Sequence, residues 1–173
     1  MVRWMLATAA LMVTGLAACS PGEGASAQTQ APPAPVQPAA SARHPVSGLE
    51  VIDLVVMRGD KRLPFRVELA ASPQAQSRGL MFRTELGDNE GMIFPSDVPE
   101  PRSFWMKNTP LSLDIIFIGP DGRITNIAAG TVPYSLDSIP SSGLASAVLE
   151  LRAGRAKELR IVPGDRVIYR LPQ

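Results

Sequence analysis

The chain has 173 residues, of which 45% are hydrophobic, with 17 basic and 16 acidic side chains. Without Arg3, Arg43 and Glu23, which precede residue 48, residues 48–173 carry 15 basic and 15 acidic residues and no net charge. This balance argues against an electrostatic surface for nucleic acid or anionic lipid headgroups, so no nucleic acid partner is expected.

Residues 1–18 are predicted to form a signal peptide. They combine an early basic residue, Arg3, with an apolar run and small residues before a cysteine, which is the pattern of an export signal. The apolar run spans roughly 14 residues, whereas a helix that crosses a bilayer needs about 20. We therefore expect a cleaved targeting segment and an exported protein.

The residues around Cys19 resemble the lipobox of bacterial lipoproteins. Leu16-Ala17-Ala18-Cys19 places the only cysteine of the chain after small residues. The resemblance implies that Cys19 becomes the first mature residue and is acylated, so the expected partner is a lipid bilayer bound through an N-terminal anchor. An incidental cysteine in an apolar leader is the alternative.

Ser20 directly follows Cys19. In proteins similar to enterobacterial lipoproteins, a residue other than aspartate at this position accompanies sorting to the outer membrane. The expected location is the periplasmic face of the inner or outer membrane.

Residues 19–47 are predicted to be a tether that follows the lipidated cysteine. The segment is rich in Pro, Ala, Gln and Ser and almost lacks large apolar residues, so it cannot bury enough surface to offset its ordering entropy. Its prolines favour extended conformations that would lift a domain off a lipid surface; a proline-rich ligand for a partner is the alternative. Residues 48–173 have the length of one domain, and a fragment from about Gly48 is expected to fold alone.

Short strand-like runs separated by glycine and proline fill this domain. The predicted strands are residues 49–57, 63–70, 114–119, 123–130, 145–151 and 165–171. The first two flank Arg58-Gly59-Asp60-Lys61, which is suited to a hairpin loop. The next two flank Pro120-Asp121-Gly122, where proline presets the first turn angle and glycine accepts a positive φ, so a second hairpin is predicted.

Two short helices are predicted between the strands. Ser72 is an N-cap candidate, Pro73 suits the first helical position and Gly79 suits the residue after the end. A second helix, from Ala153, is less favoured because Gly154 lies inside it. The fold class predicted from these elements is mainly β: a compact jelly-roll-like sandwich or barrel with one or two short helices.

Several motifs of the domain resemble those of an uncharacterised bacterial and archaeal family, the domain of unknown function 192. They occur in the family's order and rough spacing and are RGLMFR (78–83), GMIF (91–94), FWMKNTPLSLDIIFI (104–118), VLEL (148–151) and PGDRV (163–167). The resemblance implies a mainly β, jelly-roll-like fold and frequent export, but no activity. One departure is Arg160, where the family pattern leads us to expect glycine in a local turn.

The residue types of the domain exclude several kinds of catalytic site. The only histidine, His44, falls in the predicted tether, so a Ser-His-Asp or Cys-His arrangement is not expected inside the domain. No metal is expected, because the domain has no Cys or His and its carboxylates lack calcium-loop spacing. No cofactor is expected either, since no phosphate loop or dinucleotide fingerprint occurs. An acid/base pair of Asp114 and Glu150 stays open.

Polar side chains inside the motifs form the candidate site, for which no catalytic role is assigned. Asp114 opens a buried strand, where an unpaired charge would be costly. We expect it to join one polar cluster with Arg83, Lys107, Asn108 and Glu150. In the structural alternative, Asp114 and Asn108 tie a loop to backbone groups near Pro110, and Lys107 is solvated.

Trp105 and neighbouring methionines could rim such a cluster, although these residue types more often form core.

Three kinds of function are compatible with these sequence features. The first is a membrane-tethered envelope module that binds a small ligand or an envelope protein through Arg83, Trp105, Lys107, Asn108, Asp114 and Glu150. The second is a hydrolase acting on an envelope substrate through an acid/base pair, or with Lys107 as the base. The third is a structural or assembly subunit without a pocket.

Overall fold

The computed structural model of the chain describes residues 42–172, which form seven strands and two short helices. The strands are β1 (Val51–Arg58), β2 (Lys61–Leu69), β3 (Glu90–Phe104), β4 (Leu113–Ile118), β5 (Ile124–Ala128), β6 (Ile139–Arg152) and β7 (Arg166–Tyr169). The helices are α1 (Pro73–Arg78) and α2 (Arg155–Leu159). Neither of these two described helices is long and apolar enough to cross a membrane. The predicted signal peptide, the predicted lipidation site at Cys19 and the part of the predicted tether up to residue 41 lie outside the described residues.

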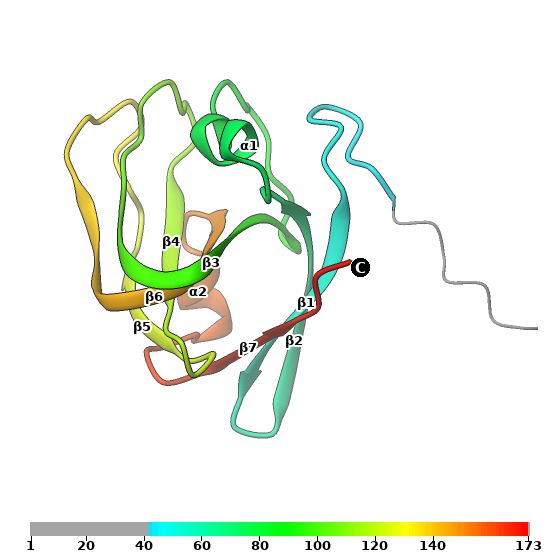
Figure 1. Cartoon of the computed structure of the whole chain (residues 1–173), viewed down its shortest axis with the longest axis vertical. Coiled ribbons are helices and arrows are strands. Elements are labelled where there is room, and N and C mark those ends of the chain that lie inside the picture. The colour runs from blue at the N-terminus through cyan, green and yellow to red at the C-terminus, as the bar shows by residue number, and fades with distance from the viewer. Residues whose placement is uncertain (1–41, 173) are drawn as a thin grey trace, which may run out of the picture. The chain divides into compact units, whose positions relative to one another are not determined.

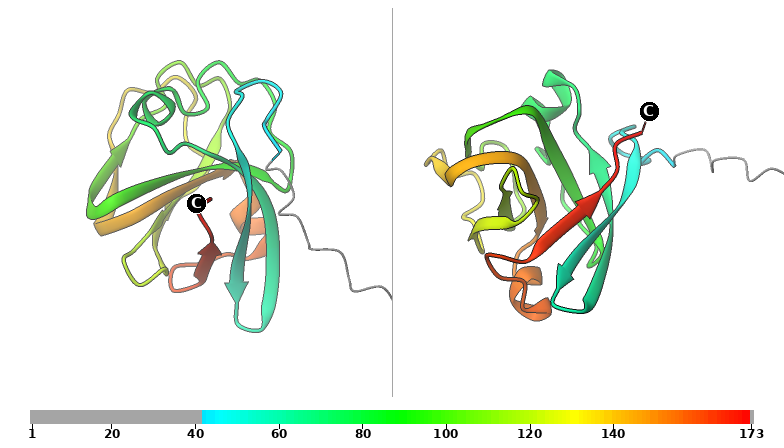
Figure 2. Two further views of the ribbon diagram at one scale, coloured as in Figure 1. Left: turned by 45° about the vertical axis from the view of Figure 1, so that its right-hand side comes forward. Right: turned by 60° about the horizontal axis from the view of Figure 1, so that its bottom comes forward.

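All seven strands belong to one sheet, in the order β5-β4-β6-β3-β2-β1-β7. The pairs are antiparallel except for β2 and β3, which run parallel. The sheet curls into a half-barrel (Figure 1, and from two further directions in Figure 2). Its outer strands approach each other at one end, where Arg123 and Arg166 form an isolated bridge. The mainly β class with short helices is confirmed, whereas one curled sheet does not by itself establish the jelly-roll or sandwich arrangement.

The two predicted hairpins are confirmed. β1 and β2 pair from Arg58 opposite Lys61 onward, leaving Gly59 and Asp60 in the loop. β4 and β5 pair across the predicted turn. Gly122 there has a φ of 75°, a left-handed backbone that glycine adopts without a steric cost.

Both faces of the curled sheet are covered by apolar side chains, which explains the uninterrupted apolar run of β4. Ile116 and Ile118 point into a first core cluster, together with Leu54, Phe65 and Leu149. The alternate residues of β4, which are Leu113, Ile115 and Phe117, point into a second core cluster with Met92, Phe94, Met106 and Val148. A strand with two buried faces reads as continuous hydrophobic sequence rather than as an alternating pattern.

β3 is the strand that the sequence analysis did not predict beyond its GMIF motif. It contains Pro95, Pro99 and Pro101, which cannot donate ladder hydrogen bonds. Its pairing with β6 shifts register between Pro95 and Glu100. The prolines therefore lie at an irregularity of a long strand rather than at its end, and β6 also begins earlier than predicted, at Ile139.

Both predicted helices are confirmed. Ser72 accepts a hydrogen bond from the Ala75 N–H at 3.1 Å, and Pro73 occupies the first turn of α1. α2 begins just after Gly154, whose φ is 84°, so this glycine precedes the helix instead of interrupting it. Arg160 ends α2 with a φ of 56°. The position where the family resemblance predicts glycine therefore does have a left-handed backbone, which arginine adopts here at some cost.

Candidate ligand-binding pocket

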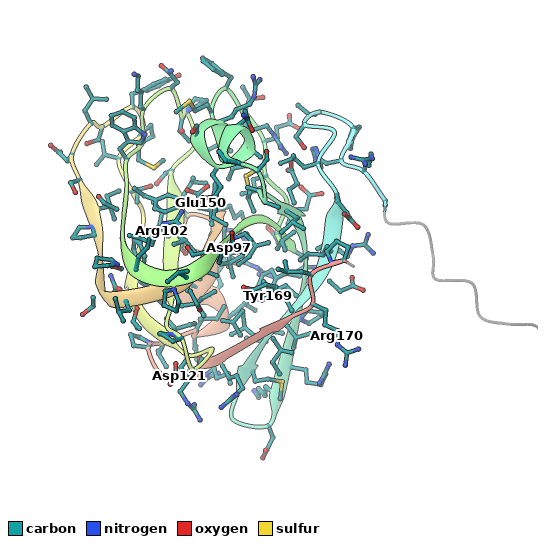
Figure 3. The ribbon with its side chains drawn as sticks, in the orientation of Figure 1. Asp97, Arg102, Asp121, Glu150, Tyr169 and Arg170 are labelled. Carbon is teal, nitrogen blue, oxygen red and sulfur yellow. The ribbon has the colours of Figure 1, made fainter. Side chains whose placement is uncertain are left out.

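A pocket of about 330 Å³ opens between α1, β3 and β6. Its lining combines aromatic rings, amide and hydroxyl groups, two arginines and one carboxyl group. These residues are Gln76, Ser77, Arg78, Gly79, Leu80, Met81, Phe94, Arg102, Ser103, Phe104, Trp105, Thr109 and Glu150. Glu150 and Arg102, which both line this pocket, are seen between α1 and β3 in Figure 3. Apolar walls with a few convergent polar groups are typical of small-molecule sites.

Glu150 is the only acidic residue of this lining. It lies on β6 opposite Met92 of β3 and Ile115 of β4, so its side chain projects among the residues of the second core cluster. The residue is 5% exposed, and no hydrogen bond joins its carboxyl group to a described residue. Among the described residues, Arg155 Nε is the one fully enclosed side-chain polar atom without a partner, so the Glu150 oxygens reach the open space of the pocket. Desolvation by burial raises the pKa of Glu150 to about 8. The carboxyl group is therefore mostly protonated at neutral pH and unpaired.

Arg102 is held in place at the side of the pocket. Its Nη2 donates to Gln76 Oε1 at 3.1 Å, and its Nη1 donates to the Ser96 hydroxyl. Gln76 is itself fixed, because its Nε2 donates to the Pro95 carbonyl at 2.8 Å. The guanidinium also lies 5.6 Å from the centroid of the Phe104 ring. The pocket thus contains a preorganised cation whose remaining N–H donors are available.

Aromatic rings form the apolar wall of the pocket. Phe104 contacts Phe94 edge to face at a centroid distance of 5.1 Å and Phe117 at 6.1 Å. Trp105 follows Phe104 and is half exposed. Lys107 Nζ lies 5.1 Å from the Trp105 ring centroid, which places a further cation next to this wall, although Lys107 itself does not line the pocket.

Asp114 does not join Glu150, because the register of β4 and β6 separates them. Asp114 is opposite Leu151 and Ile115 is opposite Glu150. Neighbouring residues of a strand point to opposite faces, so the two carboxyl groups project from opposite faces of the sheet. The acid/base pair of Asp114 and Glu150 that the sequence left open is therefore not formed.

Asp114 instead ties three backbone segments together. Its Oδ1 accepts hydrogen bonds from the N–H groups of Gly130 at 2.9 Å and Gly154 at 3.1 Å, and its Oδ2 accepts one from Ala156 at 2.9 Å. The residue is completely buried. This arrangement matches the structural alternative for Asp114, with backbone groups different from those expected near Pro110.

The single polar cluster expected from the sequence is not formed, since Asn108 and Arg83 also have separate partners. Asn108 has a φ of 56°, and its carbonyl accepts a hydrogen bond from the Phe82 N–H at 2.8 Å. Asparagine tolerates this left-handed backbone better than most residues. Its side chain contacts Met81 Sδ at 3.9 Å. Asn108 therefore shapes the loop between β3 and β4.

Arg83 belongs to a second buried cluster, built around Glu68 on β2. Its Nη1 donates to Glu68 Oε1 at 2.6 Å, and the Ser47 hydroxyl donates to Glu68 Oε2. His44 Nε2 lies 3.7 Å from Glu68 Oε1 and 3.3 Å from Arg83 Nη2. The reasoning that kept His44 away from the domain was wrong, because residues near the end of the predicted tether contact it. The Ser47 hydroxyl bonds to Glu68 and not to the imidazole, so this cluster lacks the relay that activates a serine nucleophile.

The comparisons with known proteins agree with the motifs. The model of the family DUF192, described as "Uncharacterized ACR", matches residues 54–169. The chain belongs to the DUF192 family. This confirms the resemblance predicted from the sequence motifs. No curated protein matches the chain.

Two solved structures are similar to this DUF192 protein. A protein of unknown function from Novosphingobium aromaticivorans DSM 12444 is 52% identical, with a TM-score of 0.73 over 75% of this chain and 93% of that chain. A protein from Sinorhizobium meliloti 1021, provisionally described as a transcription regulator, is 36% identical, with a TM-score of 0.68 over 70% of this chain and 95% of that chain.

The DUF192 motifs contain part of the pocket but not all of it. Trp105 and Glu150 were among the predicted site residues, and both line the pocket. Arg102 and Gln76 were missed, since they lie outside the motifs, on the irregular part of β3 and on α1. A weak signal existed, because only Ser103 separates Arg102 from the apolar FWM segment (104–106).

Proposed function

We propose that this chain is a lipid-anchored binding module of the bacterial envelope, and that the pocket between α1, β3 and β6 holds a small ligand. The observation that carries the proposal is Glu150. A carboxyl group that is 5% exposed, faces a pocket and has no hydrogen-bond partner among the described residues costs stability. Such a cost is typical of functional sites, where a ligand supplies the missing partner.

Binding is favoured over hydrolysis by the composition of the lining. The pocket has one carboxyl group, whereas acid/base cleavage of a glycosidic bond uses two that face each other. Lys107 stacks on Trp105 outside the lining, which gives it no position from which to act as a base in the pocket. Binding of a ligand requires only the aromatic rings, the arginines and the single carboxyl group that line the pocket.

The description of the Sinorhizobium meliloti protein suggests a second function, in transcription. Residues 48–173 carry equal numbers of acidic and basic side chains. Proteins that bind DNA without a basic surface are unusual, because contacts with phosphates supply most of the affinity. We therefore favour the envelope function for this chain.

Replacing Glu150 by leucine is the test of the pocket. The substitution removes a buried, unpaired carboxyl group, so we expect the melting temperature to stay level or rise. We expect the same variant to fail to complement a deletion strain, since the ligand loses its polar partner. Glu85→Gln is the matched control, because Glu85 is exposed and lies outside the pocket lining. Full complementation by a stable Glu150→Leu protein would contradict the binding function and favour an assembly subunit without a pocket.

The lipid anchor is tested separately through Cys19. We expect Cys19→Ser to abolish incorporation of radiolabelled palmitate and to block processing of the leader, because the serine offers no thiol for the acyl chain. Membrane fractionation should then show loss of the anchored form. Equal palmitate labelling of the variant and the wild type would rule out the anchor without affecting the pocket proposal.

A further inference from the structure

We propose that the pocket selects a small organic carboxylate, whose head group accepts hydrogen bonds from Arg102 and from the Glu150 carboxyl group and whose hydrocarbon part lies against Phe104 and Trp105. This inference rests on the proposed function, because it names the ligand class of the same pocket. It follows from the charges, the unused hydrogen-bond donors and the aromatic wall.

The charges that line the pocket favour an anion. Arg78 and Arg102 supply two guanidinium groups, and Glu150 supplies the only carboxyl group. Within 4.0 Å of the Arg102 guanidinium, the one carboxylate among the described residues is that of Glu100, whose Oε1 is 3.9 Å away and whose side chain is 61% exposed, so solvent screens it. Lys107 adds a cation beside Trp105 at the same wall. A ligand with a cationic head group would face these positive charges.

The guanidinium of Arg102, which lines the pocket, belongs to a group type that recognises planar anions. Its contacts with Gln76 and Ser96 fix the guanidinium but leave N–H donors free. Because the side chain is 13% exposed, these donors are partly shielded from water. A fixed guanidinium recognises carboxylates through paired hydrogen bonds at a reduced entropic cost.

Glu150 supplies a complementary donor when it is protonated. A neutral carboxyl group has one O–H, and no described residue accepts a hydrogen bond from it. The pKa of about 8 means that this O–H is present at neutral pH. Two charged groups line the pocket together with Glu150, those of Arg78 and Arg102. Arg152, also on β6, forms salt bridges with Asp88 and Glu158. The facing residues of β3 and β4, which are Met92 and Ile115, carry no charge.

The test compares three probes with one skeleton and different head groups: phenylacetate, 2-phenylethanol and 2-phenylethylamine. The full chain would carry Trp4→Phe, which leaves Trp105, in the pocket wall, as its single tryptophan and fluorescent reporter. We expect phenylacetate to bind at least about tenfold more tightly than the alcohol or the amine. Its affinity should fall as the pH rises through about 8, because ionised Glu150 repels the ligand.

Two variants and a control connect this preference to the proposed residues. Arg102→Gln should lose about tenfold or more in phenylacetate affinity, whereas Arg62→Gln, at an exposed arginine outside the pocket, should not. Glu150→Gln should remove the pH dependence of binding near 8, and this readout holds even if Arg102→Gln folds poorly. Tighter binding of the amine or the alcohol, or no binding of any probe, would overturn the carboxylate inference. The binding function itself fails only if Glu150→Leu complements.

Discussion

Replacing Asp114 by alanine is expected to lower the free energy of unfolding by about 3–5 kcal/mol. The carboxylate is completely buried and accepts hydrogen bonds from three backbone N–H groups, those of Gly130, Gly154 and Ala156. Alanine would leave the buried Ala156 N–H and the two less buried glycine N–H groups without their acceptor. Because they belong to the segment after β5 and to the start of α2, both segments should lose their attachment to β4.

Urea unfolding of the wild type and two variants would measure this effect. Asp114→Asn should cost less than alanine, about 2–3 kcal/mol, because one amide oxygen still accepts while the amide NH₂ faces a donor. Asp121→Ala is the matched control. Asp121 also accepts a backbone N–H, from Arg123 at 3.0 Å, but it is exposed, so its loss should cost about 1 kcal/mol or less. An Asp114→Ala cost as small as that of the control would contradict the structural role.

Asp114 also shows what the sequence could and could not predict. A carboxylate at the start of a buried apolar strand must have partners, and this inference needed only the sequence DIIFI. The identity of the partners could not be predicted, because they lie 16, 40 and 42 residues away and are backbone groups. Backbone donors leave no signature in the side-chain sequence.

The pairing of Asp114 with Glu150 failed for a related reason. Alternation within one strand shows which residues share a face, but it does not fix the register between two strands. A shift of one residue between β4 and β6 would have placed both carboxyl groups on the same face. The observed register places Glu150 beside Ile115 and separates the two acids.

The fold was more predictable than the site. Six of the seven strands and both helices follow from turn residues, capping residues and apolar runs, which are local signals. β3 was not predicted, because it contains three prolines, a residue type that is rare inside strands and common in turns. Arg102 lies on this strand, and it reaches the pocket because β3 continues past the register shift to pair with the start of β6. The missed strand and the missed site residue therefore have one cause.

The wild-type protein is expected to become less stable as the pH rises from about 4.5 to about 8, through the ionisation of Glu150. In this window the unfolded chain has released the Glu150 proton, whereas the folded protein retains it, because burial raises the pKa of the carboxyl group. The contribution of Glu150 to the free energy of unfolding is therefore fully present below the pKa of free glutamate. It is lost as the pH rises to the pKa of Glu150 in the folded protein. The free energy of unfolding should fall by about 1.4 kcal/mol per pH unit at the steepest point, and by up to about 5 kcal/mol in total.

Glu150→Gln separates this effect from every other titration, because the amide is neutral on both sides of the window. Glu158, whose pKa is lowered by hydrogen bonds from Arg152 and Arg155, titrates in both proteins and cancels in the difference. The free energy of unfolding would be measured by urea denaturation across the window for both proteins. The variant should be the more stable protein above pH 8, and its advantage should shrink as the pH is lowered toward the pKa of free glutamate. Parallel curves would show that Glu150 is ionised and solvated in the folded protein, and the pocket would then lack the neutral donor to which we assign ligand binding.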